Sequence, residues 1–321
     1  MIQVRRLTLL LAIASLPLLA GCSSSATSGP PPAPSQTRLY VSNGVTSGGS
    51  TLAFALPITL TSSLIGGLVT SNGPLSLCVN GSVSGSKGAL FVVQYSATNT
   101  MASPTLLAFA QPIAIAASPS FTIDVGTFPT GCVFDSTGNL YVARAPSAGS
   151  AITVIQGPVM SGSVPTTPIT TGVKFPGGVT VDGNDDVFVC NQGYITEYMP
   201  LASGNTLKAT FGSVFSASGC AIGPDGNLYV ANGTSDGEID VYKGPNFTNA
   251  STVDHSIAPL SATNIFDIKF DAKANMYVAA DTTTDSAVYV IPSPYMAASA
   301  LKFTPNPGGG DDQVRGLALT N

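Results

Sequence analysis

The sequence predicts an all-β fold, a six-bladed β-propeller with four-stranded blades. Three observations support this prediction: a strand core that recurs six times, a period of about 48 residues, and complementary half-repeats at the two ends of the chain. The recurrence is clearest in GCVFDSTGNLYVA at 131–143, which returns as GCAIGPDGNLYVA at 219–231. A repeat of this length that holds several short strands is typical of propeller blades.

The most regular element of the repeat is a strand core in which an aromatic residue precedes valine. The aromatic residues of successive copies are separated by 41 to 51 residues. They are Tyr40, Phe91, Tyr141, Phe188, Tyr229 and Tyr277. Six copies predict six blades, and we expect this core to be the second strand of each.

The other strands are placed relative to this core. Before it, segments such as 129–139 and 217–227 run from a short apolar strand into an Asp/Gly/Asn turn that suits a hairpin. After it, segments such as 51–57 and 195–200 cluster or alternate apolar residues and then stop at proline, as a strand that ends in a turn does. A looser stretch after each proline, such as 205–211, is expected to form a fourth, outer strand.

The two ends of the chain are predicted to complete one blade together. Residues 311–321 match a first strand without its second, and residues 36–43 are a second strand without its first. The interval from Tyr277 to the C-terminus and on from Gln36 to Tyr40 is 49 residues, which fits the period. An open solenoid would not explain these two half-blades, so we expect a closed ring without free edges.

The N-terminus is predicted to be an export signal. Arg5 and Arg6 precede an apolar stretch at 7–19 that is too short to span a membrane. Residues 19–22, LAGC, resemble the bacterial lipobox, which implies that residues 1–21 are removed and that Cys22 carries the lipid. The alternative is an ordinary signal peptide that contains a cysteine.

The segment after the lipobox is predicted to be a tether. Residues 22–35 are rich in Ser and Pro and lack an apolar face, so we expect an extended linker, with the propeller domain at 36–321. Ser23 stands where some lipoproteins carry an inner-membrane retention Asp. By that resemblance we expect the protein on the outer membrane, facing the periplasm or the cell surface.

The composition argues against nucleic acid as a partner. Charged residues make up only 9% of the chain, the formal net charge is -5, and no basic cluster could neutralise phosphates.

The blade motif also resembles a known group of proteins. The pattern P-x-G-x-x-x-D-x-x-G-N-L-Y-V-A, seen at 129–143, 176–189 and 218–231, resembles that of NHL-repeat propellers and of senescence-marker-protein/gluconolactonase-like propellers. The resemblance covers residues 36–321 and implies a six-bladed propeller. The group includes lactonases, a lyase, ligand-binding sensors and interaction scaffolds, so its fold alone does not determine activity.

In such propellers, ligands usually bind at the mouth of the central channel, where second strands end and first strands begin. The residues expected there are polar, and as a concave polar ring they are the candidate ligand-binding residues. They are Asn43, Gln94, Arg144, Asn191, Asn232, Asp267, Asp281 and Arg315. Asn and Asp also end strands because they hydrogen-bond nearby backbone, whereas arginine does not suit a turn, so Arg144 and Arg315 are the stronger candidates.

The resemblance implies a metal site or a catalytic histidine, and this chain does not have all the residues that these sites need. The gluconolactonase-like enzymes hold a divalent cation at the mouth with Glu, Asp and Asn, but Glu197 and Glu238 are expected in third strands, away from the mouth. Asp267 and Asp281 could replace them for a cation such as calcium. The lyase implies a catalytic histidine, and the sole histidine, His255, is expected in a surface loop. We therefore predict no catalytic residue and no cofactor.

Four cysteines remain after Cys22, and export permits disulfides. Three connectivities are open. Cys132 and Cys220 occupy the same repeat position two blades apart, which puts a bond between them out of reach. We favour Cys78 with Cys132 and Cys190 with Cys220; the alternative is that all four are small buried apolar residues.

These observations favour a binding or interaction module. We expect a monomeric propeller that is attached to the membrane through Cys22 and binds an unknown protein, peptide or carbohydrate. The alternatives are a metal-assisted lactonase or lyase and a structural component of the envelope.

Overall fold

A computed structural model describes residues 37–320 except for 45–48, 60–61, 69, 71–72, 82–86, 95–104, 115, 146–148, 234–236, 258–261 and 306–312. The chain divides into two units, Met1–Pro34 and Ser35–Asn321, and all described residues belong to the second. The predicted lipidation site Cys22 therefore lies outside the described residues. Among the described residues, no helix is long and apolar enough to cross a membrane.

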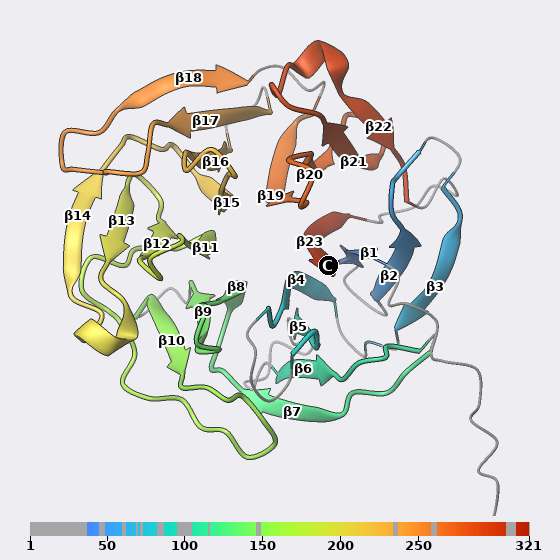
Figure 1. The fold of residues 1–321 in the computed structure, drawn as a ribbon, viewed down its shortest axis with the longest axis horizontal. Helices are drawn as coiled ribbons and strands as arrows, with labels where there is room; N and C mark the ends of the chain where they lie inside the picture. The colour runs from blue at the N-terminus through green and yellow to red at the C-terminus, as the bar shows by residue number, and fades with distance from the viewer. Residues whose placement is uncertain are drawn as a thin grey trace, which may run out of the picture. The chain divides into compact units, whose positions relative to one another are not determined.

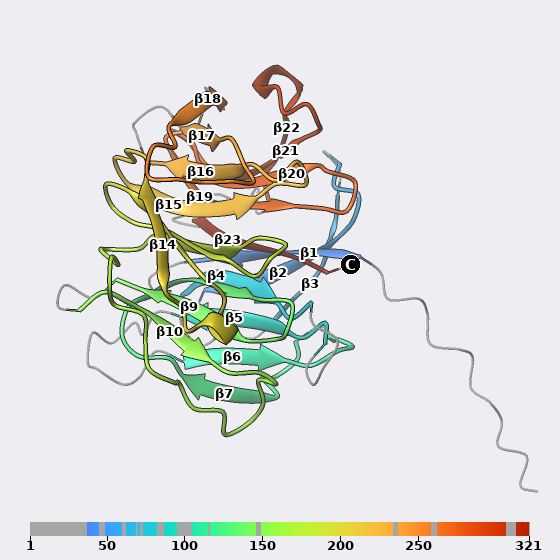
Figure 2. The same cartoon turned by 60° about the vertical axis from the view of Figure 1, so that its left-hand side comes forward.

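The strands form six sheets that surround a common axis as the blades of a propeller (Figure 1), and Figure 2 shows this ring obliquely. The first, innermost strands of blades 1 to 6 are β23 (Val314–Thr320), β4 (Pro74–Val79), β8 (Pro129–Phe134), β11 (Gly178–Val181), β15 (Ala217–Ile222) and β19 (Asn264–Phe270). The second strands are β1 (Arg38–Asn43), β5 (Leu90–Gln94), β9 (Leu140–Arg144), β12 (Val187–Cys190), β16 (Leu228–Asn232) and β20 (Met276–Asp281). The third strands are β2 (Ser50–Ala55), β6 (Thr105–Phe109), β10 (Ala151–Ile155), β13 (Ile195–Tyr198), β17 (Glu238–Tyr242) and β21 (Ser286–Ile291). The outer strands are β3 (Leu64–Leu68), β7 (Phe121–Asp124), β14 (Leu207–Phe211), β18 (Val253–Ile257) and β22 (Leu301–Phe303).

The predicted architecture and the closure of the ring are confirmed. Each aromatic-valine core lies in the second strand of its blade. The C-terminal strand β23 pairs antiparallel with β1, with Arg38 opposite Thr320 and Tyr40 opposite Ala318. The two ends of the chain thus complete blade 1 and close the ring of six blades.

Blade 3 differs from the prediction because its sheet has three strands. The segment at 156–177 takes the place of an outer strand, but it meets β10 only locally, through an isolated bridge between Ile152 and Ile169 and hydrogen bonds from Thr166 to Val154 O. Pro158, Pro165 and Pro168 in this segment lack the N–H that a strand must donate, so a continuous ladder cannot form.

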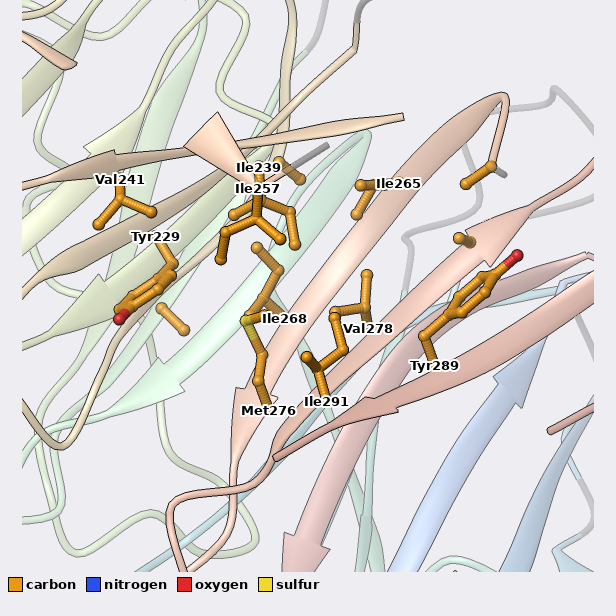
Figure 3. Packing of buried hydrophobic residues seen from close by; sticks show 14 of the residues in the cluster. Tyr229, Ile239, Val241, Ile257, Ile265, Ile268, Met276, Val278, Tyr289 and Ile291 are labelled. Carbon is orange, nitrogen blue, oxygen red and sulfur yellow. The ribbon is translucent and has the colours of Figure 1, made fainter. Parts of the chain in front are cut away.

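The core lies between blades, where neighbouring sheets pack face to face. Between blades 5 and 6, for example, side chains of β16 and β17 meet those of β19 to β21 (Figure 3). Tyr229, Ile239, Ile268, Val278 and Ile291 belong to this cluster, and all are at most 2% exposed. Because both faces of a blade are covered, its middle strands are apolar at successive positions, as in β5 and β10, whose five residues each are all buried.

In blades 3 and 6 a D-x-x-x-N turn joins the first strand to the second at the face opposite the channel mouth. In blade 3, Asp135 Oδ1 accepts hydrogen bonds from the backbone N–H groups of Thr137 (3.0 Å) and Asn139 (2.8 Å). The Asn139 amide donates to Asp135 Oδ2 (2.7 Å), and its oxygen accepts from Gly157 N–H (2.9 Å), just after the third strand. The echo in the sequence therefore reflects a repeated structural turn.

Candidate functional site

The channel at the centre of the ring is almost closed by close approach of the first strands. Gly178 and Gly219 occupy equivalent positions in blades 4 and 5, and a Cβ on Gly178 would lie 2.8 Å from the Gly219 Cα. Likewise, a Cβ on Gly316 would lie 2.7 Å from the Ser76 Cα. The remaining space measures about 10 Å³, close to the volume that one water molecule needs.

Asp267 is the one large side chain at this repeat position. Its Oδ1 accepts hydrogen bonds from Ile268 N–H (2.9 Å) and from the Lys269 ammonium (2.7 Å). Its Oδ2 accepts from Leu317 N–H (2.9 Å), which joins blade 6 to blade 1. Both carboxylate oxygens are thus occupied within the protein.

The asparagines that follow the second strands brace the loops that enter the first strands. Asn191 is fully buried; its side-chain oxygen accepts from Lys174 N–H (2.8 Å) and its amide donates to Thr196 Oγ1 (3.0 Å). Asn232 Oδ1 accepts from Phe215 N–H (3.2 Å), and its amide donates to the buried Asp240 carboxylate (2.7 Å). Both asparagines therefore have the role that this residue commonly has at strand ends, which is to hydrogen-bond nearby backbone.

Three other predicted residues of the ring are also turned into the blades. Asn43 is 7% exposed and Gln94 only 1%. Asp281 accepts a hydrogen bond from the Ser286 hydroxyl across the hairpin between β20 and β21. Most side chains of the predicted polar ring are therefore buried and contact other residues of their own blade.

The two arginines remain partly exposed on the mouth face, the face where second strands end and first strands begin. The Arg315 guanidinium lies 4.0 Å from the centre of the Phe266 ring and donates to the Gln313 side chain. Burial lowers the pKa of Arg315, and the charge of Asp281 opposes this shift. The Arg144 side chain has no hydrogen bond within the described residues, and burial lowers the pKa of Arg144 too, opposed by the charge of Asp124.

The mouth face also carries exposed phenylalanines that sequence reasoning missed. Phe128, Phe175 and Phe215 are 43%, 41% and 76% exposed. They stand just before the first strands of three consecutive blades, β8, β11 and β15. We call these three residues the phenylalanine arc. The signal that could have found them is a Phe directly before a Pro/Gly- or Ser-rich strand start, as in FPTG, FPGG and FSASG.

The residues considered for metal binding or catalysis do not come together. Among the described residues, no group of three or more His, Cys, Asp or Glu side chains could hold a metal ion. Glu238 starts β17 opposite Asn232, so it lies at the mouth edge, contrary to the prediction for this residue. His255 lies in the outer strand β18 opposite Val241, not in a loop, because the alternating segment 253–257 pairs with β17. Its exposed ring contacts Asp254 (2.9 Å).

Both disulfides that the sequence analysis favoured are present in the structure. Cys78 and Cys132 join the first strands of blades 2 and 3, with their Cα atoms 5.8 Å apart. Cys190, in a second strand, joins Cys220 in the first strand of the next blade, with Cα atoms 6.5 Å apart. Each disulfide therefore links two neighbouring blades near the axis.

No protein family model and no curated protein matches the chain, but solved structures share its fold. A Bacteroides caccae protein of unknown function has a TM-score of 0.63 at 10% identity, with 89% of this chain and 100% of that chain covered. A Desulfotomaculum acetoxidans protein has a TM-score of 0.58 at 13% identity, with coverage of 88% and 89%. The periplasmic gluconolactonase of Pseudomonas aeruginosa has a TM-score of 0.56 at 15% identity, with coverage of 84% and 82%.

These similarities define the class of protein as a six-bladed β-propeller. Its structural neighbours include gluconolactonase-like proteins. At such low identity the similarity establishes the fold and not an activity, because propellers of one architecture carry many functions.

Proposed function

We propose that this chain is a lipid-anchored binding module of the bacterial envelope, which docks a protein partner on the mouth face of an NHL-like propeller. The observation that carries the proposal is the phenylalanine arc. Exposed aromatic side chains on neighbouring elements mark interaction surfaces, and aromatic residues are enriched at the centres of protein interfaces. Phenylalanine has no polar atom, so it favours the apolar side chains of a protein partner.

The backbone around the arc supports a preorganised surface. Phe215 N–H donates to the Asn232 side chain (3.2 Å), and Phe175 N–H donates to the Ser150 hydroxyl (3.0 Å). The buried Asn191 holds the adjacent Lys174 N–H (2.8 Å). A surface that is already ordered loses less conformational entropy on binding.

The envelope location is part of the proposal. It is supported by the lipobox-like LAGC at 19–22, which would place the lipid on Cys22, and by the two disulfides, which form and persist in oxidising compartments. The outer membrane is the expected membrane because Ser23 follows the cysteine.

The test compares chemical cross-linking of the full chain with that of a Phe175→Ser/Phe215→Ser variant in the envelope of the producing bacterium. We expect one envelope protein to be cross-linked to the unaltered chain and lost from the variant. Met296→Ser is the matched control, because Met296 is 60% exposed and lies after the third strand β21, on the opposite face.

Two outcomes would contradict the proposal. One is an identical set of cross-linked proteins for the unaltered chain and for the arc variant. The other is metal-dependent hydrolysis of lactones by the purified domain, which would favour the lactonase alternative instead.

A further inference from the structure

Blade 3 carries a cavity beside its three-stranded sheet. The cavity measures about 300 Å³, which is at the lower end of the range for small-molecule sites. It lies between the end of the blade 2 outer strand and the segment at 165–168, which replaces the outer strand of blade 3. Val125, Pro165 and Pro168 form the apolar part of its wall.

Arg144 is the cation of this cavity. Its guanidinium lies against Gly126, where a Cβ would stand only 2.6 Å from Nη1. Gly126 also has a φ of +86°, so both its conformation and its lack of a side chain make room for the arginine. The Arg144 Nε is buried without a hydrogen-bond partner.

The other polar side chains in the wall each form a hydrogen bond within the protein. Thr153 Oγ1 donates to Val125 O (3.0 Å), and Thr166 Oγ1 donates to Val154 O (3.1 Å). Asp124 Oδ1 accepts from Gly126 N–H (2.9 Å). The donors left for a ligand are therefore those of the Arg144 guanidinium, and they call for an acceptor that carries negative charge.

The charge balance selects among anions. Arg144 supplies one positive charge, while the Asp124 carboxylate stands close enough to act on it electrostatically without forming an ion pair. The single charge of Arg144 balances a monoanion, whereas a dianion such as phosphate would keep one negative charge unbalanced and would be repelled more strongly by Asp124. A planar carboxylate also fits the fork of a guanidinium.

We infer that this cavity is a binding site for a small monocarboxylate with an apolar body, whose carboxylate is bound by Arg144. The apolar body would lie against the valine and the two prolines of the wall. This site is on the rim of blade 3, away from the closed channel, and does not rest on the proposed docking of a protein partner.

The test is calorimetric titration of the domain with benzoate and cyclohexanecarboxylate, and with benzamide as the neutral counterpart of benzoate. We expect at least one carboxylate to bind, benzamide to bind more weakly, and Arg144→Gln to lower the carboxylate affinity about tenfold or more. Arg315→Gln is the matched control, since Arg315 is also a partly buried arginine of the mouth face but does not line this cavity. It should leave the affinity unchanged.

A second measurement does not depend on a variant that must fold. In the unaltered domain, the NMR signal of the Gly126 amide should shift more on addition of benzoate than on addition of the same concentration of benzamide. The inference is overturned if neither carboxylate binds at about 10 mM, if Arg144→Gln binds equally well, or if phosphate binds more tightly than both carboxylates.

Discussion

Glu197 in β13 is a carboxylate that blade 4 places in its interior, with 1% of its side chain exposed. Lys208 Nζ lies 2.6 Å from Glu197 Oε1 and 2.6 Å from Asp186 Oδ2. Burial raises the pKa of Glu197, and Lys208 opposes this shift. Because the other carboxylate oxygen, Oε2, has no hydrogen-bond partner among the described residues, the charge of Glu197 depends on Lys208.

We therefore expect Lys208→Met to lower the free energy of unfolding by about 2 to 3 kcal/mol, because it leaves Glu197 without its counter-ion. The value is at the low end for a buried pair because 43% of the Lys208 side chain is exposed. Lys302→Met is the matched control: Lys302 is also on an outer strand, but its partner Asp285 is 3.4 Å away and both side chains are exposed. The control should change stability by about 0.5 kcal/mol or less. Equal effects of the two variants in urea unfolding would show that burial of Glu197 is not the cause.

For single residues, the sequence predicted the place on a strand better than it predicted what the side chain contacts. It placed Asn191 and Asn232 at the ends of second strands, where they lie. Whether such a side chain contacts a ligand or the backbone depends on its direction. For Asn191 and Asn232, the loop that enters the first strand of the blade fixes this direction through a hydrogen bond. The arginines were singled out because turn geometry does not explain them, and both remain partly exposed.

At the scale of elements, Asp and Asn side chains hold the hairpin between the first and second strands of blades 3, 5 and 6. In blade 5, Asn227 donates to Asp225 Oδ2 (2.8 Å) and accepts from Gly244 N–H (3.0 Å), which connects the hairpin to the end of the third strand. Blade 6 uses Asp271 and Asn275 in the turn (2.8 Å). Asp and Asn therefore recur in these turns because they hold the chain where it folds back from the first strand to the second.

Asn227→Ala should lower the free energy of unfolding by about 1 to 3 kcal/mol, because it leaves the Gly244 N–H without its acceptor. Asn184→Ala is the comparison in blade 4, where the exposed amide makes only a 3.3 Å contact with Asp182. That variant should change stability by about 0.5 kcal/mol or less. Denaturant titration of both variants measures the difference; a larger loss for Asn184→Ala would contradict the assigned role of the turn.

At the scale of the whole molecule, six first strands must approach one axis, and glycine makes this approach close. A Cβ on Gly178 would stand 2.8 Å from the Gly219 Cα, an approach that backbone movement would have to relieve. Gly183, in the turn of the same blade, has no atom within 4 Å of such a Cβ. Neither glycine has a positive φ, so the two differ in space and not in conformation.

Gly178→Ala should therefore destabilise the ring by about 1 to 3 kcal/mol through overpacking. Gly183→Ala should be neutral or stabilising by up to about 1 kcal/mol, since alanine lowers the entropy of the unfolded chain. Thermal unfolding followed by circular dichroism compares them. If both variants unfold at the same temperature, the channel is not as tightly packed as the structure indicates.

The sequence by itself determined the number of blades, the order of strands and the closure of the ring. These follow from a period, from runs of apolar residues and from turn chemistry, all of which are local and recur in each repeat. The two half-repeats predicted the closure of the ring, because the unpaired strand at each end of the chain can pair only with the strand at the other end.

Only the tertiary structure decided which side chains remain available to a ligand. The exposure of the phenylalanine arc and the cavity at Arg144 both arise where segments of neighbouring blades meet. Asp267 is used by Leu317, fifty residues away, and Phe175 is held by Ser150. Such pairings depend on side chains that differ from one repeat to the next, so the repeat that predicts the scaffold carries no information about them.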